Sequence, residues 1–395
     1  MDLESHADSG RPHGAPIVVV GAGLAGASVA FALAQRGLGR RVHVYEQDAA
    51  PGRHATAQNA AMVRSLLDED ELAAWGPAGT RWWNALPAEL GAPGLFRRTG
   101  SLLLAEHEAT RARLEQRVRV ARDAGLDARV LAAAEARSRM PILDSVPFSW
   151  AAYVAEDGVA DPVALTARML RAAEARGGTL HLGTAVVDFD VVPDDDEPEE
   201  DPSDSRATRR RSRLRSIGIL RGSGGRGRLE PHAVVVASGA WAPTLLRSVP
   251  TEDRGLVPWR RHLAVIGDEA DAQRLGISPH SPFVWHVDRQ AYVRHEAGGV
   301  LASACDVSAC APGVPEVADG IHDVLHARFS EVFPFLLDLP VRRIWAGLRT
   351  YRPSHDFVLG RDPSVGGLHF ACGLGGHGVT CVGVIGEFVA ASLTD

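Results

Sequence analysis

The chain has no lysine: each of the 42 positively charged side chains among its 395 residues is an arginine. Lysine forms the Schiff bases of many aldolases and pyridoxal phosphate enzymes, and it holds nucleotide phosphates in P-loop proteins. The missing lysine therefore excludes aldolases and pyridoxal enzymes of this kind, and it excludes kinases and ATPases that depend on a P-loop.

Positive charge is also scarce relative to negative charge. The 49 aspartates and glutamates give a formal net charge of −7. No general basic field is then available to recruit nucleic acid or an anionic membrane. We expect small-molecule partners and no nucleic acid.

Cysteine is rare too, with only four residues in the chain. Their number and spacing fit neither a disulfide scaffold nor a zinc site. We expect reduced thiols, a cytoplasmic protein and no bound metal. Residues 1–15 are polar and contain glycine, which favours a disordered leader.

Residues 17–34 carry no charged side chain and are long enough to imitate a membrane span. Their internal order argues against one, because a β-branched run at 17–20 stops at three glycines before an alanine-rich stretch begins. This order predicts a strand, a turn and a helix, and no membrane span.

The same segment carries a complete dinucleotide-binding fingerprint. Gly21, Gly23 and Gly26 have the G-x-G-x-x-G spacing, and a second strand predicted at 41–45 ends at Glu46, about 20 residues past the last glycine. The glycines allow a tight turn, close approach of the backbone to a pyrophosphate, and close packing of helix on strand. Glu46 would bind a ribose hydroxyl and repel a 2′-phosphate, which disfavours NADP.

Two further stretches have the G-x-G-x-x-G spacing, at 222–227 and 373–378. The first leads into Pro231, so we expect a hairpin loop there. The second lies between a strand predicted at 368–371 and a helix predicted at 379–393, with no room after it for another strand and acid. One dinucleotide is therefore expected, and the glycines do not decide between an NAD dehydrogenase and a flavoenzyme reduced by its own substrate.

Three other patches narrow this choice: a loop of small and polar residues at 51–64, the run V-V-V-A-S-G-A-W at 234–241, and A-G-L-R at 346–349 before the second glycine loop. In this order they resemble the D-amino acid oxidase superfamily of FAD enzymes. The resemblance is greatest to the D-amino acid (D-arginine type) dehydrogenases, then to the glycine and sarcosine oxidases, and it runs from residue 17 to about 393.

The resemblance implies an α/β plus α+β fold. A discontinuous, Rossmann-like FAD-binding domain would comprise residues 16–75, 151–254 and 344–395. A substrate domain with a mixed sheet would comprise 76–150 and 255–343, with antiparallel strands at 262–267, 290–295 and 300–303.

The resemblance also implies a noncovalent FAD site, because no cysteine falls where sarcosine oxidases attach their flavin. The residues it assigns fall into four groups along the cofactor. Gly21, Gly23, Gly26 and Glu46 hold the dinucleotide, Ala237, Gly239 and Trp241 border the adenosine and pyrophosphate, His54, Thr56, Gln58 and Asn59 lie under the flavin, and Gly375, Gly376, Gly378 and Thr380 lie near its ring and ribityl chain.

For the substrate, the resemblance assigns Arg349 of A-G-L-R to the carboxylate, with Arg261 and Tyr292 as further contacts. A planar guanidinium binds a carboxylate with two parallel bonds, and a tyrosine adds one donor. The amine would lie near Gly376, hydride would pass to flavin N5, and the imine would hydrolyse to an oxo acid and ammonia. The expected function is oxidation of the C–N bond of a small amino acid or amine, with a D-amino acid favoured.

Departures from the family pattern bear on specificity and on the electron acceptor. Met62 and Leu67 stand along a predicted helix where the arginine-specific relatives have histidine and tyrosine, which favours an apolar or small substrate.

His377 is similar to the sarcosine oxidase branch, and both a catalytic role and an ordinary loop position stay open. The lysine thought to speed oxygen reduction in sarcosine-type oxidases is missing, and Arg294 is its nearest equivalent. This favours a dehydrogenase, or an oxidase activated by another positive group, and the electron acceptor stays open among a quinone, a dye-like compound and O2.

Residues 193–213 form an acidic block followed by arginines, which predicts a mobile insertion in a hairpin. Its acidic half can screen its basic half, or its arginines can dock a partner. Two other functions stay open at this point: oxidation of a 2-hydroxy acid or of a carrier-tethered or secondary amine, and flavin binding without turnover.

Overall fold

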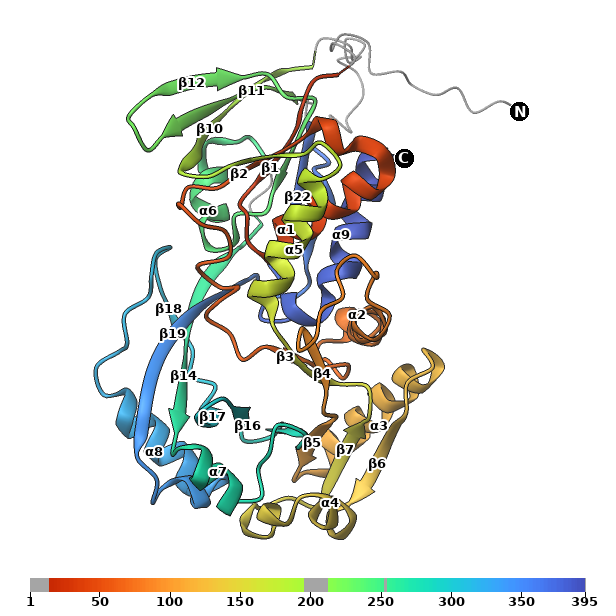
Figure 1. Cartoon of the computed structure of the whole chain (residues 1–395), viewed down its shortest axis with the longest axis vertical. Coiled ribbons are helices and arrows are strands. Elements are labelled where there is room, and N and C mark those ends of the chain that lie inside the picture. The colour runs from red at the N-terminus through yellow and green to blue at the C-terminus, as the bar shows by residue number, and fades with distance from the viewer. Residues whose placement is uncertain (1–13, 195–211, 252–253, 395) are drawn as a thin grey trace, which may run out of the picture.

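The computed structural model describes residues 14–194, 212–251 and 254–394, and these form an upper part and a lower part in Figure 1. The upper part is built on a six-stranded sheet in the order β20-β22-β13-β1-β2-β9. All its pairings are parallel except that of β20 with β22. Its strands are β1 (Ile17–Val20), β2 (Val42–Tyr45), β9 (Thr179–His181), β13 (Ala233–Val236), β20 (Val358–Arg361) and β22 (Leu368–Cys372).

Both faces of this sheet are covered, so β1, β13 and β22 are buried along their whole length and, except for His369, apolar. One face packs against helices α1 (Leu24–Leu33), α5 (Pro162–Glu174) and α9 (Gly378–Thr394). The other packs against the short helix α6 (Ala242–Leu245) and a smaller sheet. That smaller sheet contains β10 (Thr184–Pro193), β11 (Ser212–Arg221), β12 (Arg226–Leu229) and β21 (Val365–Gly366).

The lower part is built on a nine-stranded mixed sheet, and the antiparallel strands predicted in it are confirmed by β14, β16 and β17. Its core on one face includes residues of α4 (Ala133–Arg139), α7 (Glu269–Arg274) and α8 (Ile321–Val332), and on the other residues of α3 (Glu108–Asp123). The strands are β5 (Ser101–Ala105), β6 (Ala128–Ala132), β7 (Trp150–Val154), β14 (Val257–Ile266), β15 (Phe283–His286), β16 (Ala291–Glu296), β17 (Gly299–Ser303), β18 (Ser308–Ala309) and β19 (Val341–Tyr351).

Two connections join the parts. The long strands β14 and β19 pair along their length and run from the upper part into the lower part (Figure 1). A small sheet of β3 (Met62–Val63), β8 (Gly158–Ala160) and β4 (Phe96–Arg98) lies between the parts.

The domain limits inferred from the sequence do not coincide with this packing everywhere. The limit at 151 falls inside β7, which pairs with β5 and β6 of the lower sheet, and the limit at 344 falls inside β19. Helix α2 (Trp75–Asn84) packs on α9, and Trp83 and Leu90 belong to the upper core although the sequence placed 76–150 with the substrate domain. The apolar face of α2 is satisfied by α9, so the chain crosses to the lower part only after residue 95. The division into two domains remains a prediction.

One element prediction is wrong. Residues 62–67 do not form a helix, because Met62 and Val63 pair with Val159 and Gly158 of β8 and Ala61 adopts a φ of 56°. The strand, turn and helix predicted at 17–34 are confirmed, with α1 beginning at Leu24, earlier than expected. The hairpin loop predicted at 222–227 is also confirmed, between β11 and β12.

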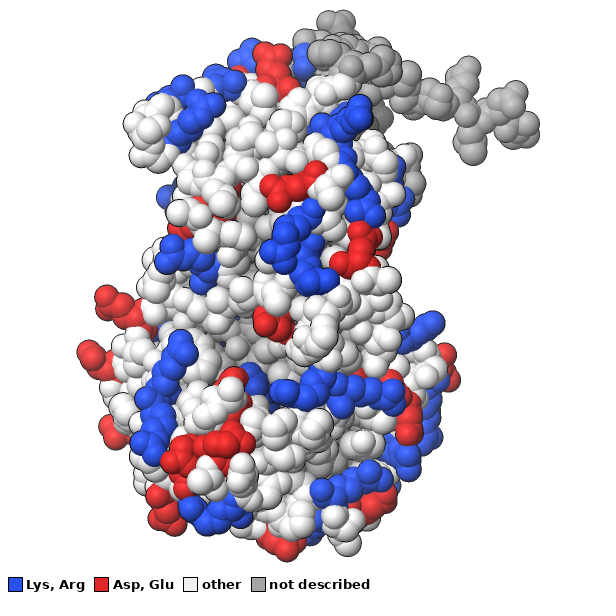
Figure 2. Space-filling view, viewed as in Figure 1, with Lys and Arg blue, Asp and Glu red and all other residues white. Residues whose placement is uncertain are grey.

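The predicted charged insertion and the predicted leader lie mostly outside the described residues. Strands β10 and β11 do pair on either side of the insertion, as expected. No helix in the described ranges combines the length and apolar character needed to cross a membrane. On the face shown in Figure 2, arginines and carboxylates are interspersed with uncharged surface.

Candidate active site

A cavity of about 440 Å³ brings together residues from both parts of the molecule. Nearly all residues assigned from the sequence line it, and two do not: Gly26 and Tyr292. The assigned residues in its wall are Gly21, Gly23, Glu46, His54, Thr56, Gln58, Asn59, Ala237, Gly239, Trp241, Arg261, Arg349, Gly375, Gly376, His377, Gly378 and Thr380.

The glycine turn of the upper part is shaped by contacts that leave no room for side chains. Gly21 has a φ of 102°, and a Cβ atom there would lie 2.8 Å from the Ala237 carbonyl oxygen. A Cβ atom on Gly26 would lie 1.9 Å from the Gly21 carbonyl oxygen. Gly26 therefore acts behind the cavity wall, by letting α1 pack against the turn.

Glu46 stands at the end of β2 beside this turn. Its Oε2 accepts a hydrogen bond from the Ala22 N–H (2.8 Å), and its Oε1 accepts one from the Asp48 N–H (3.0 Å). The backbone thus fixes the carboxylate at the cavity wall, where a ribose hydroxyl could reach it.

The N-terminus of α1 opens on the cavity. Its N-cap, Gly23, offers no side-chain acceptor, and its first turn has no acidic residue. The Thr56 Oγ1 accepts from the Leu24 N–H (2.9 Å), which places Thr56 at this helix end. Free N–H groups and the helix dipole favour anions at this helix end, and the position of Thr56 under the flavin stays a prediction.

Several buried polar atoms of the cavity wall have no hydrogen-bond partner within the protein: His54 Nδ1, Gln58 Oε1 and Ser238 Oγ. The His54 ring is held by Asp48, whose Oδ2 lies 2.7 Å from Nε2, and it packs against Trp241. Buried polar groups of native proteins are nearly always satisfied, so these atoms indicate a polar ligand. Together with the glycine turn and α1, they fit a dinucleotide such as FAD.

At the other end of the cavity, Arg349 on β19 and Arg261 on β14 face the same side of the lower sheet. Arg261 pairs with Gly347 and Arg349 pairs with Trp259, so the two arginines are diagonal neighbours. A Cβ atom on Gly347 would lie 2.3 Å from the Gln58 carbonyl oxygen. The A-G-L-R motif therefore needs its glycine for the loop to pack on the strand, and its arginine faces the cavity two residues later.

The two guanidinium groups form no ion pair with any carboxylate of the described residues. Arg261 instead donates from Nε to the Asp306 carbonyl oxygen (3.2 Å). Burial, together with the positive charge of Arg261, lowers the pKa of Arg349 to about 10. An anion bound between them would offset both effects.

Tyr292 lies on β16 behind the cavity wall. Its hydroxyl is fully buried and has no hydrogen-bond partner, and its ring stacks on Trp285 at 4.8 Å between centroids. Burial raises the pKa of Tyr292, while the nearby charge of Arg349 acts to lower it. The hydroxyl can reach a ligand only if one penetrates to this depth.

His377 belongs to a dyad that the sequence did not reveal. Its Nε2 lies within hydrogen-bond distance, 3.3 Å, of Oε1 of Glu69. Burial alone would raise the pKa of Glu69, but the bond to His377, the charge of His377 and that of Arg64 lower it to about 2. Beside the dyad, Gly376 has a φ of 101°, and a Cβ atom there would lie 3.0 Å from Arg349 Nη1.

Two further residues of the cavity wall, Arg64 and Trp285, were also missed. The Cζ atom of Arg64 lies 4.3 Å from the Trp285 ring centroid, and the Arg64 N–H donates to Thr380 Oγ1 (3.0 Å). A single charged residue in the run A-A-M-V-R-S-L-L was the available signal. Leu67, by contrast, is buried in the upper core away from the cavity, while Met62 does line it.

Arg294 is not among the residues of the cavity wall. Its Nε donates to the Ala60 carbonyl oxygen (2.6 Å), and its Nη2 forms an ion pair with Glu296 at 2.5 Å. This cation therefore supports the loop that carries Asn59 and is already neutralised.

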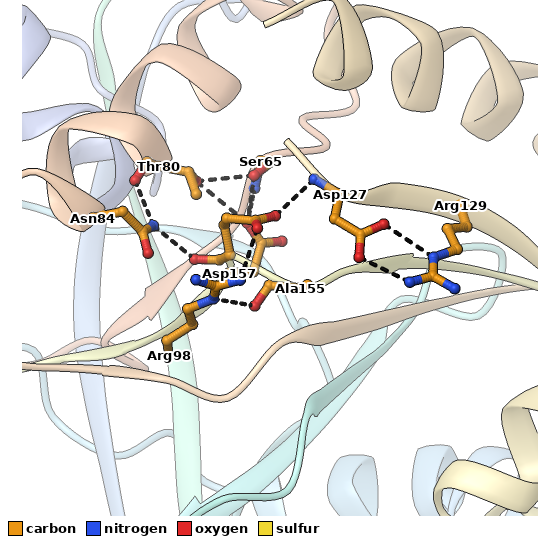
Figure 3. Close-up of polar contacts among 9 residues, drawn as sticks. Ser65, Thr80, Asn84, Arg98, Asp127, Arg129, Ala155 and Asp157 are labelled. Carbon is orange, nitrogen blue, oxygen red and sulfur yellow. Dashed lines mark hydrogen bonds and ion pairs between the residues drawn. The ribbon is translucent and has the colours of Figure 1, made fainter. Parts of the chain in front are cut away.

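A buried carboxylate, Asp157, anchors the segment that carries Arg64 (Figure 3). Its Oδ1 accepts from the Ser65 N–H (2.9 Å), from the Ser65 hydroxyl and from Thr80 Oγ1 (3.2 Å), and its Oδ2 accepts from Ser101 Oγ (2.6 Å). Burial raises the pKa of Asp157 to about 6 in spite of these bonds. Asp157, which directly precedes β8, thus fixes the backbone next to Arg64.

The cysteines do not change this description. All four are free thiols, and burial raises the pKa of Cys372, which borders the cavity, to about 12. In the described part of the chain, no group of three or more histidine, cysteine, aspartate and glutamate side chains could hold a metal ion.

Comparison with known proteins gives consistent results. The uncharacterized oxidoreductase YurR of Bacillus subtilis (strain 168) is 27% identical over 395 residues, which cover 95% of this chain and 93% of that protein. Mitochondrial sarcosine dehydrogenase of Mus musculus is 22% identical over 393 residues, covering 96% of this chain but 39% of that protein.

Solved structures show the same fold. L-proline dehydrogenase from P. horikoshii superposes with a TM-score of 0.79 at 22% identity, covering 97% of this chain and 94% of that chain. Glycine oxidase from Geobacillus kaustophilus superposes with a TM-score of 0.74 at 22% identity, covering 96% and 94%.

The family model described as FAD dependent oxidoreductase matches residues 16–392. Because this match spans almost the whole chain, the resemblance inferred from the sequence is confirmed: the chain belongs to the D-amino acid oxidase family of FAD-dependent oxidoreductases, and its cofactor is FAD.

Proposed function

We propose that this oxidoreductase oxidises the C–N bond of a small amino acid or amine, with a D-amino acid as the favoured substrate, to an imine. The observation that supports this most directly is the pair Arg349 and Arg261, which face the cavity from adjacent strands without a carboxylate partner among the described residues. Both arginines are partly buried, and taking a cation out of water without an anion beside it is costly unless a ligand supplies the anion.

In this proposal, Arg349 binds the substrate carboxylate through two parallel N–H bonds, and Arg261 and the Tyr292 hydroxyl add single bonds. These contacts fix the carboxylate end of the substrate. Gly376, which packs against Arg349 and has no side chain to obstruct it, accepts a hydrogen bond from the substrate amine through its carbonyl oxygen.

Bound FAD supplies the hydride acceptor for this oxidation. The substrate must lose an ammonium proton before its nitrogen lone pair can assist hydride loss. No side chain has to take that proton if the substrate binds with its amine already neutral, and His377, held through Nε2 by the ionised Glu69, borders this part of the cavity. Precise orientation of this kind is the main contribution that the chain itself makes to the rate.

We further infer that the FAD is bound without a covalent link and that the electron acceptor is a quinone or a dye-like compound. The protonated thiol of Cys372 and the ion pair of Arg294 with Glu296 support these two points, since neither a thiolate nor a free Arg294 cation is offered to the flavin. A cytoplasmic location is proposed from the four free thiols.

The experiment is anaerobic mixing of the holoprotein with D- and L-amino acids, N-methylated amines and 2-hydroxy acids, while bleaching of the flavin absorption band is followed. We expect bleaching by amino acids or amines, with formation of the oxo acid. Bleaching by 2-hydroxy acids alone would replace the proposed reaction with alcohol oxidation, and no bleaching at all would leave flavin binding without turnover. Reoxidation by oxygen and by a quinone, compared in the same apparatus, tests the acceptor.

A further inference from the structure

The substrate end of the cavity contains more donors for an anion than one carboxylate can use. Three guanidinium groups line it, those of Arg64, Arg261 and Arg349, and the hydroxyl of Tyr292 and the Nε1 of Trp285 are both buried without a hydrogen-bond partner. The mechanism proposed above uses only Arg349, Arg261 and Tyr292.

A carboxylate has two oxygens with about four lone-pair sites. Two bonds from Arg349, one from Arg261 and one from the Tyr292 hydroxyl fill those sites. Arg64 and the Trp285 Nε1–H are then left without a role in binding the first carboxylate. Trp285 is only 7% exposed, so its unpaired N–H has no ready access to bulk water.

Arg64 is a buried cation whose own partner compensates it poorly. Its side chain is 5% exposed, and both its Nη1 and Nη2 lie 3.3 Å from a single oxygen of Asp68, whose side chain is 27% exposed. Strong charge-assisted bonds to carboxylates are about 2.7–2.9 Å long, so this pair leaves donor capacity unused. Arg64 is also close enough to Arg349 for its charge to lower the pKa of that guanidinium.

Arg64 and Trp285 form one unit. The guanidinium lies over the indole ring at 4.3 Å from its centroid, and both side chains border the cavity. Stacking fixes the guanidinium plane, and the Asp157 bonds fix the backbone one residue away. A preorganised donor pair of this kind is what a second anionic group would need.

Resting on the function proposed above, we propose that the substrate carries a second carboxylate and that Arg64 and Trp285 Nε1 bind it. The substrate class is therefore an amino or imino dicarboxylate, held at one end by Arg349 and Arg261 and at the other by Arg64. Met62 and Leu263 supply the apolar wall between, against the carbon chain.

The first test measures binding without turnover. The holoprotein is titrated with succinate and, separately, with butanoate, an anion of the same chain length with one carboxylate, by calorimetry and by the flavin difference spectrum. We expect succinate to bind about 10- to 100-fold more tightly. Arg64→Gln should remove this difference, whereas Arg129→Gln, which makes the same change in an exposed ion pair (Figure 3), should keep it. Equal affinities in the unaltered protein, or an equal loss for both anions in Arg64→Gln, would overturn the proposal.

The second test uses oxidisable pairs. Flavin bleaching rates are compared for aspartate and asparagine, for glutamate and glutamine, each in both configurations, and for iminodiacetate and sarcosine. The dicarboxylate should be favoured by about 10- to 100-fold in at least one pair, and Arg64→Gln should lower its rate constant while leaving the matched monocarboxylate within about threefold. If monocarboxylates bleach the flavin as fast as dicarboxylates, the second carboxylate site is refuted while the proposed oxidation stands. If no amine bleaches the flavin but succinate still binds through Arg64, the proposed oxidation is refuted and the site stands.

Discussion

The two ends of the cavity recognise their ligands by different means. At the nucleotide end, the groups that shape the site are mainly backbone: the glycine turn, the amides of α1 and the amides that fix Glu46. At the substrate end they are side chains, from arginines and aromatics of β14, β15, β16 and β19. A backbone site requires glycines where a side chain would block the ligand, and these glycines are close together in the sequence. A side-chain site requires particular side chains at particular places, and these come from residues far apart in the sequence.

The largest loss of stability and of cofactor binding is expected for a substitution at the nucleotide end. Gly26→Ala should lower the free energy of unfolding by about 4 kcal/mol and abolish FAD binding, because its Cβ atom would lie 1.9 Å from the Gly21 carbonyl oxygen. Urea unfolding and the FAD content of the purified protein measure both effects.

Gly23→Ala is the matched control, since its Cβ atom would be 3.5 Å from Thr56 Oγ1, an ordinary contact. It should leave stability within about 1 kcal/mol and weaken FAD binding only, because the second glycine serves the approach of the pyrophosphate. A stability loss as large as that of Gly26→Ala would contradict the division of roles between the two glycines.

The next largest effect falls on the substrate end. Arg349→Met should lower kcat/KM for the amine substrate by about 100-fold, or about 3 kcal/mol, without loss of FAD, because it removes both bonds to the carboxylate. Arg343→Met, on the exposed part of the same strand, is the control and should leave kcat/KM unchanged. Kinetics of Arg349→Met that match those of the control would remove Arg349 from the site.

Asp157, which anchors the segment that carries Arg64, gives the folding stability a pH dependence with a defined sign. Burial raises its pKa from 3.8 to about 6, so the folded protein binds a proton that the unfolded chain has already lost between these values. The free energy of unfolding of the unaltered protein, relative to that of Asp157→Asn, should be highest below pH 4. This difference should fall by about 3 kcal/mol as the pH rises through 6. Urea unfolding of both proteins from pH 4 to pH 8 measures this difference, and a difference that does not vary with pH would show that Asp157 does not titrate in this range.

The smallest effects are expected for Tyr292→Phe, which should make the ligand-free protein more stable but weaken substrate binding. Tyr292→Phe removes a buried hydroxyl that has no partner, so the ligand-free protein should become more stable by up to about 1 kcal/mol. The same change should raise KM about fivefold if the hydroxyl binds the substrate carboxylate. An unchanged KM combined with higher stability would place the hydroxyl outside substrate binding and make Tyr292 a support for Trp285 alone.

The difference between the two ends also explains how far the sequence could be interpreted. The turn at Gly21, the strand β1 and the acid at Glu46 are close in sequence, so their spacing predicted β1, the turn, α1 and β2 correctly. The mixed sheet was implied by the family resemblance, and β14, β16 and β17 correspond to the strand candidates named within it. The residue limits of the upper and lower parts could not be predicted from the sequence, because the packing of α2 on α9 brings together residues about 300 positions apart.

The substrate end could be predicted only where the family resemblance supplied it. Arg349 and Arg261 came from the resemblance, and the alternation of side chains along paired strands explains why both face the cavity. Arg64 could not be found in this way, because its direction depends on the pairing of β3 with β8 and on Asp157, more than 90 residues away. The helix predicted at 62–67 failed for the same reason: tertiary pairing outweighed local preference.

The paired strands β14 and β19 have a mechanical consequence. Their register is continuous from Val257 and Tyr351 to Val265 and Arg343, so the two ends of the molecule share one twisted ribbon. A hinge motion that opened the cavity would have to shear these hydrogen bonds, whereas turns and loops at the rim can move at little cost. The distance between the flavin and the carboxylate anchor is thus set by a stiff spacer, and substrates of different length must be accommodated by exchanging side chains on its surface.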